Sequence, residues 1–257
     1  MLSSQFRIVD IGIVAENKIL SKDTVMVTPI ESLPMLQGEI RYDPKVIDVT
    51  GSDDNGSEYN ESIVMDLTVE AKWLPLGNTN RRTAPDVRRG ERLLLWRTGN
   101  SDSYYWTSMG LDDDHRKLET IIFSVSATAD ENKDGTTYDN SYFLEISSHT
   151  KTITLHTSDA NNEPFKYTFQ FNLKDGAVIL SDDVGNYFEL DSSKTKLTLK
   201  NKDGTYFVMD KKIIEAYAPD TIDAKAEKHI KLTCGGSVFT LTPSETTLKT
   251  PKFTGKR

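Results

Sequence analysis

From about Asp130 onward, apolar and polar residues alternate along the chain in short stretches. Between residues 165 and 173 every second residue is aromatic or leucine, and the residues between them are polar. The same period of two recurs in Thr195-Lys-Leu-Thr-Leu-Lys200 and in Ile230-Lys-Leu-Thr-Cys234. This alternation is typical of a β-strand with one buried face and one face in water. We therefore expect the second half of the chain to consist almost entirely of short β-strands.

A strand–turn–strand unit repeats within this half. Residues 142–156 resemble residues 187–200, and weaker copies follow at 204–210 and 236–242. Turn sequences such as Lys202-Asp-Gly204 separate the strands. Repetition of this kind is the mark of a solenoid, an array or an intertwined fibre. It points away from an enzyme, because no catalytic combination of residues lies within the repeats.

Two architectures fit the alternation: a β-sandwich formed by one chain, or three chains wound into a triangular β-prism. Only 37% of the residues are hydrophobic and the mean hydropathy is -0.48. A chain this polar either has thin cores or completes its core with copies of itself. In a prism each strand supplies only one wall of a shared core, and winding the chains together removes exposed strand edges. The composition therefore favours the prism.

The first half is predicted to be a compact β-domain, and it holds all three tryptophans. Five or six strands with one long loop suit a small Greek-key barrel of OB type. A polar, turn-prone run at 128–137 marks the boundary, so we predict domains at 1–128 and 129–257. The predicted strands of the first half are 6–15, 24–29, 38–42, 62–73, 91–98 and 104–109, with 118–127 as an exit strand and with turns at 53–57 and 99–102. The best candidates for short helices are 112–118 and 211–218.

Charge and composition narrow the functional classes. The net charge is -8 at pH 7 and the pI is about 5.1, so no broad attraction to DNA or to anionic lipid is expected. Cys234 is the only cysteine, which excludes an intrachain disulfide and gives no sign of an oxidising compartment. No signal peptide is expected at the amino terminus, and no stretch approaches the roughly 18 apolar residues of a membrane span. We expect a protein that is made and folded in a cytoplasm.

Four stretches of the first half form a recognisable series: Trp73-Leu-Pro-Leu-Gly77, Ala84-Pro-Asp-Val-Arg-Arg-Gly-Glu91, Leu93-Leu-Leu-Trp96 and Tyr104-Tyr-Trp-Thr107. With the Gly-Asn-Ser-Asp turn at 99–102, the series resembles the amino-terminal OB domain of the central spike proteins of contractile tails. The rest resembles that family's carboxy-terminal half, a trimeric β-helix with strands rich in glycine, serine and threonine, such as residues 234–242. The family includes the membrane-piercing baseplate spikes of phages, pyocin spikes and the type VI secretion spike.

The resemblance implies an all-β fold, with an OB-fold-like collar followed by a trimeric, intertwined β-helix or β-prism. It also implies a structural, non-enzymatic role as a homotrimer in the virion, at the centre of the tail baseplate. The collar would bind the baseplate hub proteins, and tail contraction would drive the prism through the host outer membrane. The protein would be made in the host cytoplasm.

The sequence departs from the spike family in one respect that bears on cofactors. Some spikes bind an iron ion at the tip through a His-x-His pair. Here no two of His115, His149, His156 and His229 are separated by one residue. We therefore expect no metal or other cofactor, and a separate protein that caps the tip.

Two further motifs suggest metal or carboxylate chemistry. Asp130-Glu-Asn-Lys-Asp-Gly135 matches the first half of an EF-hand loop, but its twelfth position is Ser141 and strands flank it, so a polar turn is preferred. Asp112-Asp-Asp114 beside His115 is interpreted as a solvated loop, because Arg116 and Lys117 follow.

The alternation along the strands predicts which face of the sheet two other candidate residues occupy. His229 has outward parity, away from any threefold axis. Cys234 shares the inward parity of Leu232 and is interpreted as a small buried hydrophobe. No catalytic site is predicted, because neither Cys234 nor the histidines have a partner that would make a nucleophile–base pair.

The first half also raises single-stranded nucleic acid as a ligand, since its arginines are interleaved with aromatic residues that can stack on bases. Because the chain is net acidic, we prefer the alternative that the arginines face the hub or an acidic neighbour and that the aromatics form the barrel core. No nucleic-acid partner is therefore expected. The residues concerned are Arg81, Arg82, Arg88, Arg89, Arg92, Arg97, Trp96, Tyr104, Tyr105 and Trp106.

Two other functions stay open at this point. A receptor-binding trimeric fibre would use the same prism to recognise a surface glycan. Aromatic residues exposed near the tip would favour this receptor-binding function. The last segment of the chain contains only one aromatic residue, Phe253. A carbohydrate-active enzyme on a trimeric β-scaffold would need a conspicuous acidic groove with two facing carboxylates.

Overall fold

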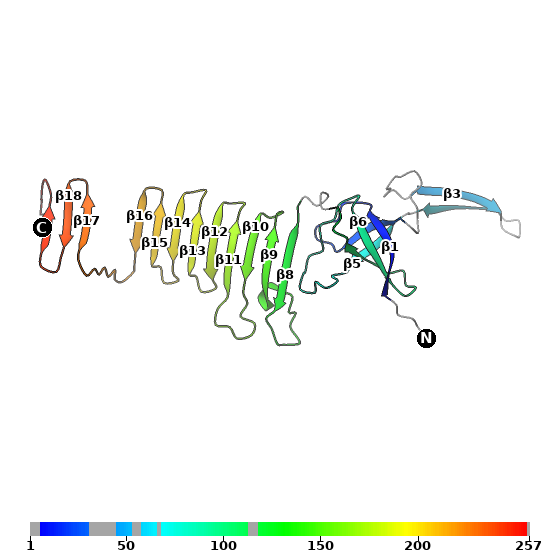
Figure 1. Cartoon of the computed structure of the whole chain (residues 1–257), viewed down its shortest axis with the longest axis horizontal. Helices are drawn as coiled ribbons and strands as arrows, with labels where there is room; N and C mark the ends of the chain where they lie inside the picture. Colours follow the sequence, from blue (N-terminus) through cyan, green and yellow to red (C-terminus); the bar gives the residue numbers. More distant parts are fainter. Residues whose placement is uncertain (1–5, 31–44, 53–57, 66–67, 113–117, 256–257) are drawn as a thin grey trace.

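The computed structural model of the chain describes residues 6–30, 45–52, 58–65, 68–112 and 118–255, and within these residues the protein is all-β, as predicted. Its parts follow one another along a single long axis (Figure 1). A two-stranded hairpin lies at one end and is followed by a closed barrel and a nine-stranded sheet. A three-stranded sheet near the carboxy terminus forms the other end. The chain is therefore elongated.

The barrel confirms the barrel predicted for the first half. It is a closed sheet in the order β1-β2-β5-β7-β6, in which β1 pairs antiparallel with β6 and β5 pairs in parallel with β7. Its strands are β1 (Phe6–Val14), β2 (Thr24–Pro29), β5 (Val69–Trp73), β6 (Arg92–Thr98) and β7 (Tyr104–Ser108). Alternate residues of these strands point inward and form the core together with the loop before β6. The core residues are Val14, Val25, Val27, Ala71, Ala84, Val87, Leu93, Leu95 and Trp106.

Gly12 lets β1 approach the barrel core closely. A Cβ atom at this position would lie 2.1 Å from Val27 Cγ1 and 3.0 Å from Leu95 Cδ1. Val27 and Leu95 are both fully buried. Neither side chain can therefore move away without disturbing the packing around it.

We expect Gly12→Ala to lower the free energy of unfolding of the barrel by about 1–3 kcal/mol, the usual cost of overpacking a core. Denaturant titration followed by tryptophan fluorescence measures this cost, because the three tryptophans lie in β5, β6 and β7. Gly255→Ala is the control, since a Cβ atom there would meet no atom within 4 Å. Equal stability of the two variants would contradict the close approach of β1.

The nine-stranded sheet is a single layer in which each strand pairs antiparallel with the next one along the chain. It is not a sandwich closed by the chain itself. The predicted repeats at 142–156 and 187–200 are the hairpins β9–β10 and β13–β14. The strands are β8 (Thr120–Ser126), β9 (Ser141–Ser147), β10 (Thr152–His156), β11 (Tyr167–Asn172), β12 (Ala177–Asp182), β13 (Tyr187–Asp191), β14 (Lys196–Lys200), β15 (Tyr206–Asp210) and β16 (Ile213–Tyr217).

Two smaller sheets complete the described chain. The tip sheet consists of β17 (Ile230–Cys234), β18 (Ser237–Leu241) and β19 (Thr246–Lys249), and residues 218–229 join it to β16. At the other end, β3 (Lys45–Ser52) and β4 (Glu58–Met65) form an antiparallel hairpin in which Lys45 pairs with Met65. Figure 1 shows this hairpin projecting beyond the barrel.

The structure corrects three predictions of secondary structure. The strand predicted at 62–73 is two strands, β4 and β5, which belong to different sheets. Strand β3 was not predicted. The helix predicted at 211–218 is wrong, because Ile213–Tyr217 forms β16 and pairs with β15. The predicted strand at 38–42 and turn at 53–57 lie outside the described residues, as does most of the helix predicted at 112–118.

The loop before β6 fastens the barrel to β8, the first strand of the large sheet. Arg81 forms an ion pair with Glu119 at 2.5 Å, and Arg82 donates hydrogen bonds to Ser124 Oγ and to the carbonyl of Ile122. The only described helical turn, Tyr138–Asn140, lies further on, before β9. Several polar contacts therefore connect the barrel with the sheet.

Candidate assembly interface

The two faces of the nine-stranded sheet differ in character, because the pairing registers keep residues of one parity on one side. On one face, two parallel rows of apolar side chains run from β8 to β16. The first row is Phe123, Leu144, Leu155, Phe169, Leu180, Phe188, Leu199, Phe207 and Ala216. The second row is Ile121, Ile146, Ile153, Phe171, Val178, Leu190, Leu197, Met209 and Ile214. We call this surface the apolar face.

The apolar face is uncovered in the single chain. Leu180 and Leu199 are each 45% exposed, and Phe207 is 37% exposed. In a monomeric soluble protein, contiguous exposed apolar patches rarely exceed a few hundred Å². An apolar surface that crosses nine strands is therefore a candidate interaction site.

The opposite face, called here the polar face, carries mostly threonine, serine, lysine and acidic side chains. Near the barrel it is covered by the chain itself, because the segment between β8 and β9 folds over it. Phe143 is 7% exposed and packs edge-on against Tyr138, with ring centroids 4.2 Å apart. Ser158 donates a hydrogen bond to the carbonyl of Asp139. The chain thus covers the barrel end of the polar face, whereas none of its described residues covers the apolar face.

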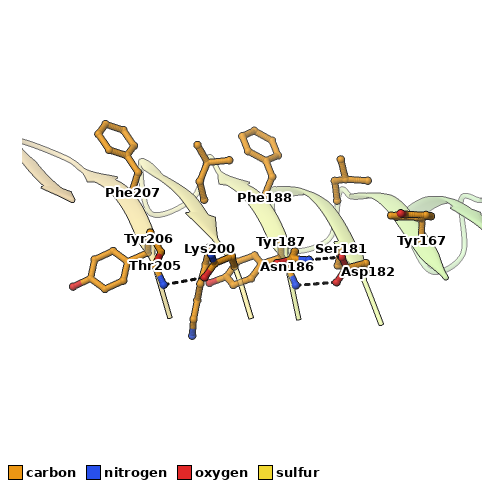
Figure 2. Close-up of a pocket in the computed structure, with 13 residues that line it drawn as sticks. Tyr167, Ser181, Asp182, Asn186, Tyr187, Phe188, Lys200, Thr205, Tyr206 and Phe207 are labelled. Carbon is orange, nitrogen blue, oxygen red and sulfur yellow. Dashed lines mark hydrogen bonds between the residues drawn. The ribbon is translucent and has the colours of Figure 1, made fainter. Parts of the chain in front are cut away.

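A groove of about 540 Å³ lies beside the first apolar row, where strands β12–β15 meet their turns. Figure 2 shows Phe188 and Phe207 on one side of the sheet and Tyr187, Lys200 and Tyr206 on the other. The groove ends at polar turn residues that include Asn186 and Thr205. It is an apolar depression with a polar rim at the ends of the strands.

Carboxylates in the turns hold the hairpins and so fix the register on which the two faces depend. Asp182 Oδ1 accepts hydrogen bonds from the amides of Val184, Gly185 and Asn186. A hydrogen bond from the Asn186 side chain, together with these backbone bonds, holds the pKa of Asp182 below its ordinary value. Asp191 accepts hydrogen bonds from Lys194 and Ser193, which lower the pKa of its carboxyl group in the same way.

The tip sheet repeats the pattern on a small scale. Leu232, Phe239 and Leu248 are paired across its three strands, and Ile230 pairs with Leu241 on the same face. Cys234 shares this face, as its parity predicts, but it is exposed in the single chain. The burial predicted for Cys234 is therefore not achieved by the chain alone.

The histidines are dispersed in the structure. His149 lies at the junction with the barrel, with Nε2 3.3 Å from Asp86 Oδ2. His156 lies on the polar face, and burial lowers its pKa. His229 is exposed beside β17, and His115 lies outside the described residues. Among the residues that the structure describes, no group of three or more His, Cys, Asp or Glu is placed to hold a metal ion.

The EF-hand-like segment is a self-contained turn. Asp130 Oδ1 accepts hydrogen bonds from the amide and the side chain of Asn132. Asp134 Oδ1 accepts them from the amide and hydroxyl of Thr136. These bonds lower the pKa of both carboxyl groups. One carboxylate oxygen of each aspartate is therefore bonded within the turn.

The basic and aromatic stretch of the barrel is tied into the fold. Trp106 is fully buried in the barrel core, as the aromatic-core alternative predicts. Arg88 pairs with Asp86 at 2.9 Å and Arg97 lies 3.4 Å from Asp102. Arg92 pairs with Asp112, whose hydrogen bond raises the pKa of the guanidinium. Tyr104 is half-buried and packs against the core. The predicted place in the core is wrong for Trp96 and Tyr105, which pair with each other on the outside of the barrel beside Phe6. Arg89 is exposed.

Within the described residues, no helix has the length and the hydrophobicity that are needed to span a membrane. A comparison of the sequence with models of known protein families finds no match. A comparison with curated proteins finds none either.

Proposed function

We propose that the chain is the central spike of a contractile tail and works as a homotrimer in which three apolar faces close around a common axis. The single observation that carries the proposal is the apolar face itself, which runs through the nine-stranded sheet without a cover. Fully burying an exposed Leu, Ile or Phe side chain is worth about 1.5–3 kcal/mol. The side chains of the apolar face are already about half-buried, so each gains about half of this on assembly. Together the two rows outweigh the roughly 4–15 kcal/mol that association costs.

Two considerations support three copies in this proposal: the shape of the sheet and the resemblance to spike proteins. The strands are five to seven residues long, so the sheet is a narrow, single-layered ribbon. Two such ribbons face to face would leave the groove at the strand ends open to water. Three ribbons arranged as the walls of a prism would close the interior on every side, with each groove meeting the neighbouring copy.

The position of the barrel supports a collar that attaches to a larger assembly. The barrel lies at one end of the long axis, and its strand order, with β5 parallel to β7, is that of an OB-type Greek key. In the proposal the collar binds the baseplate hub proteins. The tip sheet lies at the other end, where a capping protein would add.

The polar face fits the mechanical role. In a prism built on the apolar faces, the polar faces would form the outside of the needle. A needle driven through an outer membrane needs continuous strand pairing along its length and an exterior that does not adhere to lipid. The antiparallel pairing from β8 to β16 meets the first requirement and the polar face meets the second.

Electron microscopy of contractile particles from the source cells tests the proposal. Gold-labelled antibody against this chain is expected at the axial tip of the baseplate, and particles made without the chain are expected to contract without killing. Label at the ends of peripheral fibres would contradict the spike role and favour a receptor-binding fibre. Full killing by particles without the chain would contradict both.

A further inference from the structure

A row of aromatic side chains with a lysine among them runs along the polar face, at the same strand ends as the groove. Tyr187 of β13 pairs with Lys200 of β14, Lys200 pairs with Tyr206 of β15, and Tyr206 pairs with Tyr217 of β16. The four side chains therefore lie side by side on adjacent strands. Figure 2 shows three of them, Tyr187, Lys200 and Tyr206, on the side opposite Phe188 and Phe207. We call these four residues the tyrosine row.

Two members of the tyrosine row, Lys200 and Tyr217, are exposed, and the other two, Tyr187 and Tyr206, are half-buried. The rings of Tyr206 and Tyr217 are stacked with centroids 5.4 Å apart, and Tyr217 is 50% exposed. Lys200 is exposed. Within the described part of the chain, Lys200 has no ion pair and none of the three tyrosine hydroxyls has a hydrogen-bond partner. Tyr187, Lys200 and Tyr206 also line the groove, but their side chains point away from Phe188 and Phe207 (Figure 2), so in the proposed prism the row lies on the outside.

A shallow depression continues the row toward the barrel. It has a volume of about 440 Å³ and is lined by Ser181, Tyr187 and Glu189 together with the turn that follows β12. The aromatic wall of Tyr187 therefore stands beside a hydroxyl and a carboxylate. This combination of a ring face with hydrogen-bonding groups is the chemistry that sugar rings require: C–H groups lie on the ring and hydroxyls bond at its edge.

We propose that the tyrosine row binds an extended acidic polysaccharide of the cell surface. Neighbouring strands are about 4.8 Å apart, so Tyr187 and Tyr206 stand about 10 Å apart with the ammonium group of Lys200 between them. Successive sugars of an extended chain can cross these strands, with ring faces on Tyr187 and on the side of Tyr206 that Tyr217 does not cover, and with a carboxylate or phosphate at Lys200. This binding goes beyond the mechanical role of a spike and would hold the shaft at the envelope before contraction.

The charges around the row favour a polysaccharide over a nucleic acid. A nucleic acid carries a negative charge on every nucleotide, and the row offers it one cation, Lys200. Glu189 and Glu215 lie on the same face of the neighbouring strands. They would repel a densely charged backbone. A polysaccharide with one acidic group in each repeat can place that group at Lys200. It then presents uncharged hydroxyl groups to the two glutamates.

Affinity electrophoresis of the full-length protein tests the proposal, in native gels that contain hyaluronan, dextran or no polysaccharide. Hyaluronan, which carries one carboxylate in each disaccharide repeat, is expected to retard the protein. Tyr206→Leu is expected to weaken the apparent affinity about tenfold, the effect of losing one aromatic stacking partner. Lys200→Gln is expected to weaken binding to hyaluronan and to leave migration in dextran unchanged.

Two controls alter the same face without touching the row. Val208→Ala lies two residues from Tyr206 on β15, and Lys196→Gln removes a lysine from the other end of β14. Both are expected to bind hyaluronan as the unchanged protein does. Absence of retardation in hyaluronan would overturn the proposal, as would equal losses in the controls. Tighter binding to an oligothymidylate than to hyaluronan would overturn it in favour of nucleic acid.

Discussion

Replacing Leu199 by aspartate is expected to turn a particle of about 87 kDa, three times the 28.9 kDa of one chain, into single chains. Leu199 stands in the first apolar row, where it pairs with Phe188 and Phe207. In the prism three aspartates would converge on the axis without a partner. Desolvating an unpaired carboxylate costs several kcal/mol for each copy. Light scattering coupled to gel filtration measures the mass.

The adjacent residue provides a matched control for this substitution. Lys200 belongs to the same strand and is exposed on the polar face. Lys200→Asp introduces the same carboxylate one residue away and is expected to leave the mass at about 87 kDa. If both variants keep the mass of the unchanged protein, or if both lose it, the assignment of the apolar face as the interface is wrong.

Trp106→Ala is expected to lower the free energy of unfolding of the barrel by about 3–5 kcal/mol, the usual cost of removing a large aromatic side chain from a core. Trp106 is fully buried, and its Nε1 donates a hydrogen bond to the carbonyl of Asp23 at 3.1 Å. Denaturant titration followed by fluorescence reports on the barrel alone, because the other two tryptophans, Trp73 and Trp96, also lie in its strands.

Trp96→Ala is the control for this second substitution. Trp96 is half-buried on the outside of the barrel, where it stacks on Phe6 with ring centroids 5.4 Å apart. It is expected to cost far less than Trp106→Ala, since its removal leaves no enclosed cavity. A cost for Trp106→Ala no larger than for Trp96→Ala would contradict the assignment of Trp106 to the core. Circular dichroism should show that neither substitution changes the large sheet.

The strands of the second half could be predicted because their alternation is strong and their turns are explicit. The alternation from 165 to 173 is visible in the sequence, and β11 follows it with Phe169 and Phe171 on one face. The error at 211–218 has a physical cause. Lys211, with φ of 51°, completes a tight turn that brings Ile213 opposite Asp210, and pairing with β15 outweighs any local tendency toward helix.

Features that depend on register could not be predicted. Tyr187, Lys200, Tyr206 and Tyr217 are unevenly spaced in the sequence, and they become neighbours only when the length of each turn is known. The contact between Asp86 and His149 joins residues far apart in the chain. No periodic signal points to such a contact. The apolar face was implied by parity, but its continuity across nine strands follows from the observed registers.

Sedimentation equilibrium of the unchanged protein at several concentrations tests the central claim most directly: that the apolar face is buried against further copies of the same chain. The account predicts one species with a mass near 87 kDa that persists on dilution, three times the 28.9 kDa of the chain. A soluble, folded species of 28.9 kDa would contradict it, because a stable single chain has no need of a cover for its apolar face.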